Sequence, residues 1–340
     1  MKKTLLLGAV ATVAFAGAAN AQSRDQIQIA GSSTVLPFAN IVAEQFGQVT
    51  EFATPIVESG GSSGGLRLFC QGIGEQTIDI ANSSRLINEK DIAACEAGGV
   101  TDIREIRIGY DGIVFASSVD GESFAFEPVD LYMALAAQIP VDGELQANPY
   151  THWNDIDESF PDQEIMLFIP GENHGTREVF EEKVLAVGCE AYAEENGIDF
   201  AAIEESCIPV RKDGRSVDIA GDYTETLARI EATPTAVGVF GLSFYDQNRD
   251  RIQVATVNGI VPSLETIGSG EYPVSRPLQF YVKGEHVGII PGLEEYVEFF
   301  LSDQVAGQQG RLVEAGLIPM SDAERQEVLD NFFNGVTVTQ

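Results

Sequence analysis

The chain has few histidines and cysteines, and it lacks the short motifs that hold common metals and nucleotides. It contains three histidines and four cysteines in 340 residues. No H-x-x-H, H-E-x-x-H or C-x-x-C spacing occurs, which argues against a zinc site and a thioredoxin-like redox pair. No G-K-[ST] sequence occurs, so the chain has no Walker phosphate loop. The sequence therefore predicts no metal and no cofactor.

Positive charge is also scarce. Twenty Lys and Arg residues stand against 52 Asp and Glu residues, which gives a formal net charge of −32. This excess would repel nucleic acid and anionic membrane surfaces at long range, so neither is predicted as a partner. A small anionic ligand is still compatible with it, because surface carboxylates are screened over about 8 to 10 Å in ordinary salt.

Long apolar runs are absent beyond the N-terminus. There, two lysines precede the apolar run from Thr4 to Ala19, and Ala19-Asn20-Ala21 fits the small-x-small pattern of a cleavage site. The run is short for a membrane span, and no cysteine follows it to carry a lipid anchor. We predict a signal peptide over residues 1–21, cleavage after Ala21, and a periplasmic, monomeric mature protein.

The four cysteines fall into two separated pairs. In an oxidising compartment the economical pairing is Cys70 with Cys95 and Cys189 with Cys207, one bridge for each local loop. Four buried free thiols are the alternative.

The length and the pattern of apolar residues predict a two-domain α/β protein. Roughly 320 mature residues exceed what one hydrophobic core usually serves. Strand and helix patterns alternate throughout, which favours largely parallel sheets. The segments Ile103 to Ser117 and Leu278 to Val282 have the pattern of strands that cross from one domain to the other.

Three strand-turn-helix units carry glycine and hydroxyl residues at their turns. The first turn is Gly31-Ser32-Ser33-Thr34, the second runs from Ser59 to Gly65, and the third runs from Pro170 to Thr176. The first backbone N–H groups of a helix lack partners and attract anions. Ligands of parallel sheets bind beyond the carboxyl ends of the strands. We therefore expect these three turns to converge on one small anion.

A fourth polar stretch follows the predicted strand Thr77 to Ala81. It reads Asn82-Ser83-Ser84-Arg85. Arg85 is either a bidentate clamp on an oxyanion or an ordinary surface arginine in a loop.

In this order and spacing, the segments resemble the substrate-binding proteins of high-affinity phosphate ABC transporters. The likeness covers nearly the whole mature chain. The motifs that carry it are Gly31-Ser32-Ser33-Thr34-Val35 with Pro37, the turn from Ser59 to Gly65, Asp79 to Arg85, His174-Gly175-Thr176 with Phe180, Tyr272 to Pro277, and Gly316 to Pro319.

The resemblance implies a two-lobed periplasmic binding protein fold of type II, with the ligand cleft between lobes joined by two crossing strands. Lobe I would comprise residues 22–112 and 272–340, and lobe II residues 113–271. The ligand would be inorganic phosphate, handed to the permease subunits of an inner-membrane ABC transporter, and the protein would not be an enzyme. The implied phosphate-binding residues are Ser32, Ser33, Thr34, Ser63, Gly64, Ser83, Ser84, Gly175 and Thr176.

The chain departs from the family at two places. Family members have a serine before the Gly-Thr of the third turn and an arginine upstream, where this chain has His174 and Pro170; they also have an aspartate at Ser84. That aspartate accepts the proton of a protonated phosphate and would repel sulfate. We hypothesise that Arg85 or Arg177 supplies the guanidinium and that Asp111 supplies the acceptor. His174 would donate to the anion or pack beside it.

Two other functions fit part of the pattern. Sulfate, molybdate, arsenate or an organic phosphate could occupy the same hydroxyl and N–H donors. The segment Gly61-Ser62-Ser63-Gly64-Gly65 also matches G-x-S-x-G, the nucleophile elbow of hydrolases, and His152, His174 and His286 are candidate bases. Anion binding accounts for all three turns, whereas the elbow accounts for one, so no catalytic residue is predicted.

Overall fold

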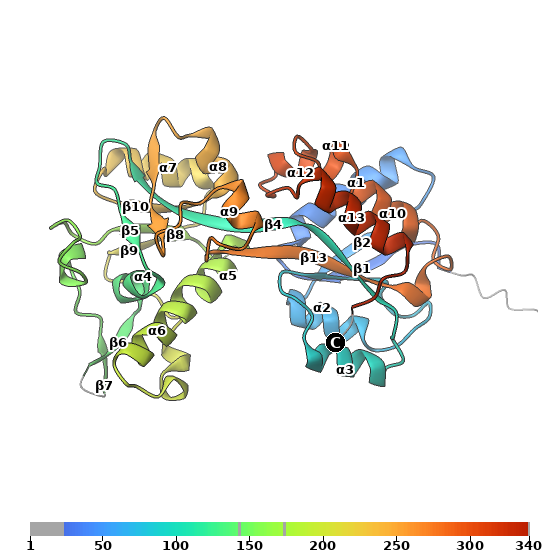
Figure 1. The fold of residues 1–340 in the computed structure, drawn as a ribbon, viewed down its shortest axis with the longest axis horizontal. Helices are drawn as coiled ribbons and strands as arrows, with labels where there is room; N and C mark the ends of the chain where they lie inside the picture. Colours follow the sequence, from blue (N-terminus) through green and yellow to red (C-terminus); the bar gives the residue numbers. More distant parts are fainter. Residues whose placement is uncertain (1–23, 142–143, 173–174, 339–340) are drawn as a thin grey trace, which may run out of the picture.

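The computed structural model describes residues 24–141, 144–172 and 175–338. The predicted signal peptide and His174 lie outside the described residues. Figure 1 shows two groups of helices and strands joined by two long strands, β4 (Ile103–Ser118) and β13 (Ser275–Lys283). This arrangement confirms the predicted two-lobed α/β fold. The predicted lobe boundaries fall within β4 and just before β13, and they stay a prediction.

Nine of the described strands form one mixed sheet that runs through both lobes. Strands β1 to β3 are parallel in one lobe, and β8 to β10 are parallel in the other. Between them β13 is antiparallel to β3 and β4, and β4 is antiparallel to β10 and β11. The order is β2 (Ile56–Ser59), β1 (Gln28–Gly31), β3 (Ile80–Ser83), β13, β4, β10 (Val237–Gly241), β8 (Leu167–Pro170) and β9 (Ser216–Ile219), with β11 (Ile252–Val254) beside β4.

The whole of β13 is paired with residues 103–112 of β4. Their register runs from Ile103 opposite Lys283 to Gly112 opposite Ser275. The register shifts beside Gly109, whose φ is +152° and where a Cβ would lie 2.5 Å from the Ile318 carbonyl oxygen. Only glycine tolerates this approach. The crossing strand predicted over Ile103 to Ser117 is confirmed, and β4 continues through Tyr110, Asp111 and Gly112.

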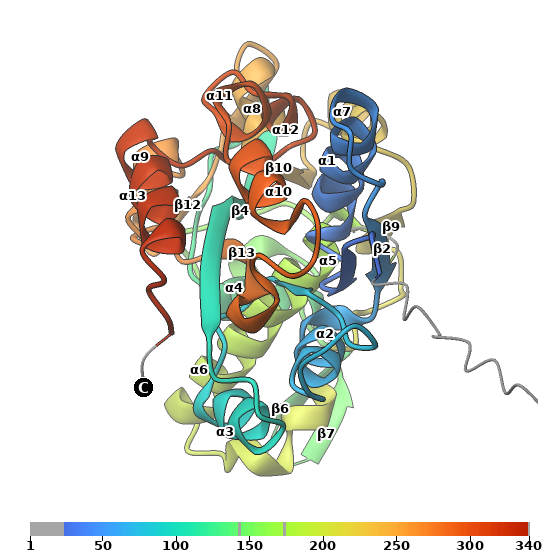
Figure 2. The same ribbon diagram turned by 90° about the vertical axis from the view of Figure 1, so that its right-hand side faces the viewer.

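Helices cover both faces of each half of the sheet. Figures 1 and 2 place α1 and α10 on one side of the strands β1 to β3, and α2 and α3 on the other. The Phe46 ring of α1 packs edge-on against Tyr296 of α10, 5.4 Å between centroids. Lobe I contains α1 (Leu36–Val49), α2 (Gly61–Phe69), α3 (Glu89–Ala97), α10 (Leu293–Phe300), α11 (Asp303–Ala306), α12 (Arg311–Glu314) and α13 (Asp322–Phe333).

Lobe II contains a nearly continuous helical segment with a π-helical turn in its middle. This segment consists of α5 (Gly175–Phe180), the π-helix Glu181–Ala186 and α6 (Val187–Glu195). Lobe II also contains α4 (Pro128–Leu135), α7 (Tyr223–Ala232), α8 (Leu242–Gln247), α9 (Leu264–Gly268), β5 (Ala125–Phe126), β12 (Thr256–Val257), β6 (Gln138–Val141) and β7 (Glu144–Ala147).

The glycine-serine turn after β2 is shorter than the sequence suggested. We expected the helix to begin near Leu66, but α2 begins at Gly61 and includes most of that turn. A Cβ on Gly65 would lie 2.5 Å from the Gly31 Cα. Because Gly65 has no Cβ, α2 can pack directly against the end of β1.

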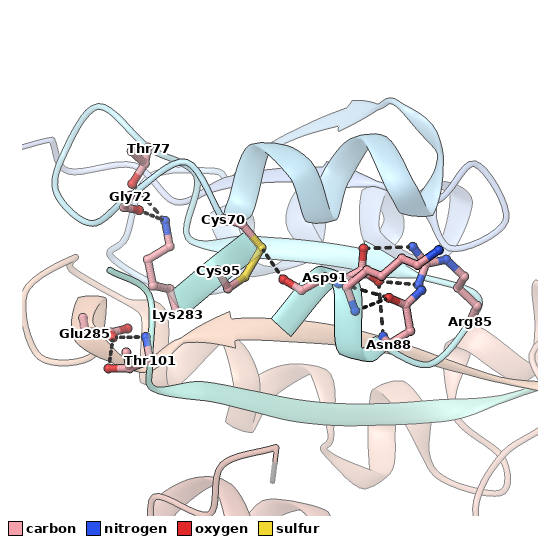
Figure 3. The surroundings of a disulfide bond; sticks show 11 residues. Cys70, Gly72, Thr77, Arg85, Asn88, Asp91, Cys95, Thr101, Lys283 and Glu285 are labelled. Atoms are coloured by element: carbon pink, nitrogen blue, oxygen red, sulfur yellow. Dashed lines mark hydrogen bonds and ion pairs between the residues drawn. A yellow bond between two sulfur atoms is a disulfide. The ribbon is translucent and has the colours of Figure 1, made fainter. Parts of the chain in front are cut away.

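Both predicted disulfides are present. Cys70 is bonded to Cys95, and Cys189 is bonded to Cys207. Figure 3 shows the first bridge, which links the end of α2 to α3. Within the described ranges, no helix combines the length and apolar character needed to cross a membrane.

Candidate functional site

The polar segments of lobe I meet at one edge of the sheet. In the parallel register Gly31 lies opposite Ser59 on one side and Asn82 on the other, so β1, β2 and β3 end together. The Ser62 and Ser84 hydroxyl oxygens, from the segments after β2 and β3, are 3.1 Å apart. The first two predicted turns therefore lie together with the fourth polar stretch in lobe I.

The first turn orders the start of α1. The buried Ser32 side chain accepts hydrogen bonds from the backbone N–H groups of Thr34, at 3.2 Å, and Val35, at 3.3 Å. Ser33 is exposed, and Thr34 is buried. Ser32 thus acts on the helix start, and Thr34 is the residue of this turn that faces lobe II.

Arg85 is held within lobe I. Its guanidinium pairs with Asp91 at 2.6 Å and donates to the Ser63 hydroxyl at 3.0 Å. Figure 3 shows Arg85 beside Asp91 and Asn88, at the start of α3. The Ser83 hydroxyl also turns to this loop and donates to the Arg85 carbonyl oxygen, at 2.6 Å. Ser63 and the neighbouring Gly64 lie on the first turns of α2.

A cavity of about 340 Å³ lies between residues of both lobes. Thr34 and Phe38 line it from lobe I, Thr176 and Tyr223 from lobe II, and Asp111 from the crossing strand β4. The Ser62–Ser84 pair and Arg85 are not part of this lining. Of the predicted site residues, the cavity therefore brings together Thr34, Asp111 and Thr176.

Arg276 on β13 places its guanidinium group beside this cavity, next to Thr34. Its side chain is 3% exposed. Its Nη2 donates to the Thr34 hydroxyl at 2.9 Å and to Glu178 Oε2 at 3.2 Å, and its Nη1 donates to Glu182 Oε2 at 3.0 Å. Sequence reasoning missed Arg276 as a site residue. The available signal was its position in the Tyr272 to Pro277 motif, at the start of a predicted crossing strand.

Asp111 has a carboxyl group with unusual proton affinity. Burial raises its pKa, since the charged form loses hydration, and the nearby Glu178 carboxylate raises the pKa further. The Arg276 guanidinium, whose Nε is 3.8 Å from Asp111 Oδ2, acts in the opposite direction. The net direction is upward, so the carboxyl can exchange a proton with a ligand closer to neutral pH than an exposed aspartate can.

Arg177 is bonded to residues of lobe II. It donates to the Pro170 carbonyl oxygen at 2.9 Å and pairs with Glu181 at 2.7 Å and Asp218 at 2.5 Å. These contacts fasten α5 to β8 and β9. The residue of α5 that reaches lobe I is instead Glu178, whose carboxylate accepts from the Thr34 hydroxyl at 2.8 Å.

Tyr223 is a further cavity residue that the sequence did not single out. It lines the cavity together with Thr176, whose buried hydroxyl oxygen has no hydrogen-bond partner among the described residues, and burial raises the pKa of the Tyr223 hydroxyl well above the usual value. The hydroxyl is therefore protonated at neutral pH and able to donate. Its position at the start of α7, after Gly221-Asp222, was the only sequence signal.

The described histidines have other partners. His286 contacts Asp79 through Nδ1 at 2.6 Å and accepts from the Gly74 N–H through Nε2, and His152 contacts the Thr151 hydroxyl. Over residues 24–141, 144–172 and 175–338, no three His, Cys, Asp or Glu side chains gather as metal ligands would.

The chain is similar to a known domain family, to named bacterial proteins and to a solved structure. Residues 16–304 match the PBP superfamily domain. Protein SphX of Synechocystis sp. is 29% identical over 309 residues, 88% of this chain and 80% of that protein. The phosphate-binding protein PstS of Staphylococcus saprophyticus is 25% identical over 339 residues, covering 96% and 91% respectively. A crystal structure of a possible phosphate binding protein from Planctomyces limnophilus superposes with a TM-score of 0.70 at 23% identity, covering 92% of this chain and 99% of that one.

Proposed function

The chain belongs to the PBP superfamily, and on that premise we propose that it binds inorganic phosphate between its lobes and delivers it to an ABC permease. The observation that carries this proposal is the cavity lined by Thr34, Asp111 and Thr176, together with the buried Arg276 guanidinium that donates to the Thr34 hydroxyl. Hydroxyl, guanidinium and carboxyl groups together suit a partly protonated tetrahedral oxyanion. Relatives named as phosphate-binding proteins support the same ligand.

In this proposal each cavity residue has a distinct task. Thr34 and Thr176 donate hydroxyl hydrogen bonds from opposite lobes. Arg276 supplies the positive charge that we had assigned to Arg85 or Arg177. Asp111 accepts the proton of phosphate and disfavours sulfate, which has none to give. The other predicted ligand-binding residues stay predictions, namely Ser32, Ser33, Ser63, Gly64, Ser83, Ser84, His174 and Gly175.

The buried donors make binding strong despite the acidic surface. A guanidinium that is 3% exposed acts in a low-dielectric setting, where a charge-assisted hydrogen bond is worth more than in water. Closure of the lobes around the ligand would dehydrate it further. The closed form would be the one that permease subunits recognise.

The proposed cellular setting follows from the N-terminal sequence. Export through the predicted signal peptide, with cleavage after Ala21, would bring a monomer to the periplasm. Lobe I would comprise residues 22–112 and 272–340, and lobe II residues 113–271.

Binding without turnover is the function we favour over hydrolysis. The Ser63 hydroxyl of the G-x-S-x-G segment accepts from Arg85, and it is exposed on α2. The described histidines, His152 and His286, bond to Thr151 and Asp79. A serine nucleophile needs a base within hydrogen-bond reach, so these contacts favour a non-catalytic role for the segment.

Isothermal titration of the mature protein tests the proposal. Phosphate is expected to bind tightly at neutral pH and moderate salt, while sulfate produces no heat. Sulfate binding as tight as phosphate would point to a general oxyanion-binding protein, and no heat from either anion would contradict the proposal.

A further inference from the structure

One carboxylate oxygen bridges the two lobes. Oε2 of Glu178, on α5, accepts from the Thr34 hydroxyl at 2.8 Å and from Arg276 Nη2 at 3.2 Å. Thr34 lies between β1 and α1, and Arg276 lies at the start of β13. A single side chain of lobe II thus joins two buried donors that the sequence separates by 242 residues.

These donors are the ones that an oxygen of a bound anion would use. A carboxylate oxygen and a phosphate oxygen accept the same charge-assisted hydrogen bonds. Thr34 is 6% exposed and Arg276 is 4% exposed, so bulk water has little access to either. An anion therefore cannot engage both donors fully while Glu178 holds them.

We propose that Glu178 is an internal competitor of the bound anion, which phosphate must displace from Thr34 and Arg276. This inference rests on the proposed function as a phosphate-binding protein. In the displaced position Glu178 no longer joins α5 to lobe I. The contact therefore sets phosphate affinity and also holds the lobes together before phosphate binds.

Neutralising Glu178 isolates this effect because Arg276 keeps other partners. Glu182 remains at 3.0 Å from its Nη1, and Asp111 remains at 3.8 Å from its Nε. Glu178→Gln removes one negative charge and keeps the side-chain size. Glu190→Gln is the matched control, since Glu190 is exposed on α6 of the same helical segment.

Titration with inorganic phosphate gives the first readout. We expect Glu178→Gln to bind phosphate about tenfold more tightly than the wild type, as a like charge is removed and the remaining amide oxygen is a weaker competing acceptor. Glu190→Gln is expected to match the wild type. Unchanged or weaker phosphate binding by Glu178→Gln would overturn the proposal, since the carboxylate would then have no effect on phosphate binding or would favour it.

Small-angle X-ray scattering without added phosphate gives the second readout. Glu178→Ala removes the acceptor as well as the charge, and this loss of the bridge is expected to raise its radius of gyration above that of the wild type and Glu190→Ala. An unchanged radius would show that Glu178 does not hold the lobes together. If the wild type itself gives no heat with phosphate, the proposed function fails, and the radius of gyration alone then decides the role of the Glu178 contact.

Discussion

Arg276 on β13 lies directly opposite Asp111 on β4, in the ladder that joins the two lobes, with 3.8 Å between Arg276 Nε and Asp111 Oδ2. Each side chain has a buried polar atom without a hydrogen-bond partner, namely Nε of Arg276 and Oδ2 of Asp111. Buried polar atoms normally have partners. The pair therefore has donor and acceptor capacity left for a ligand at the lobe junction.

The guanidinium of Arg276 is expected to be required for tight phosphate binding. Arg276→Lys keeps the charge but loses the planar fork that reaches Thr34 and the anion together. We predict that the phosphate dissociation constant rises about 10- to 100-fold by isothermal titration. Arg249→Lys is the control, because Arg249 is paired with Asp246 on the surface. Equal losses in both variants would remove the special role of Arg276.

Asp111 is expected to decide between phosphate and sulfate. Asp111→Asn replaces the proton acceptor with a neutral amide, so sulfate is no longer repelled by a carboxylate. The variant should bind phosphate about tenfold more weakly and gain measurable sulfate binding. Competition titrations with both anions measure this change, with Asp120→Asn on the turn after β4 as control. Unchanged affinity and selectivity would assign proton recognition to another residue.

The buried carboxylate of Asp79 is expected to stabilise lobe I strongly. It accepts from the Gln28 N–H at 2.7 Å and contacts Arg24 and His286, and its side chain is fully buried. Since Gly74 N–H donates to His286 Nε2, the proton of this ring resides on Nδ1 and is donated to Asp79.

Removing the Asp79 charge leaves the Arg24 guanidinium, whose side chain is 12% exposed, without its carboxylate partner, and breaking a buried ion pair costs about 3 to 5 kcal/mol. We therefore predict a loss of that size for Asp79→Asn in urea unfolding. Asp246→Asn, at an exposed ion pair, should change the free energy of unfolding by less than about 1 kcal/mol. Similar small effects for both variants would mean that the Asp79 network contributes little.

Asp213 is expected to make the stability of the folded protein sensitive to acid. The hydrogen bond from Arg211 lowers the pKa of this carboxyl to about 2, from an ordinary value of 3.8. The folded state thus binds fewer protons than the unfolded state between these values, so this contribution is complete above about pH 4 and is lost as the pH falls toward 2.

Asp213→Asn should cost about 1 kcal/mol at pH 7, a value reduced for the 44% exposure of the carboxylate. The difference from the wild type should shrink as the pH falls from about 4 to about 2. Urea unfolding at several pH values measures it. A difference that stays constant across this range would rule out Asp213 titration as its cause.

The local features of this fold could be predicted from the sequence. Periodicity and turn chemistry predicted the units around β1 and β8, and the apolar alternation predicted β4 and β13. The disulfides followed from local pairing of cysteines, 25 and 18 residues apart. The start of α2 was predicted too late, since the contact of Gly65 with Gly31 depends on tertiary packing.

The sequence did not predict which arginine lies beside the cavity, because long-range ion pairs and hydrogen bonds determine it. Arg177 reaches Asp218, 41 residues away, while Arg276 reaches Thr34, 242 residues away. Arg85 instead satisfies a partner six residues away, Asp91. The local sequence around each arginine does not indicate which one lies beside the cavity. The pairing of β13 with β4 does, because it places Arg276 opposite Asp111.

The position of the bound anion tests the central claim most directly. Arsenate has the shape and charge of phosphate, and its arsenic atom can be located by anomalous X-ray scattering in crystals grown with it. We predict one strong peak in the cavity, within hydrogen-bond reach of Thr34, Thr176 and Arg276 through the arsenate oxygens. A peak beside Ser63 and Arg85 instead, or no peak between the lobes, would contradict the account.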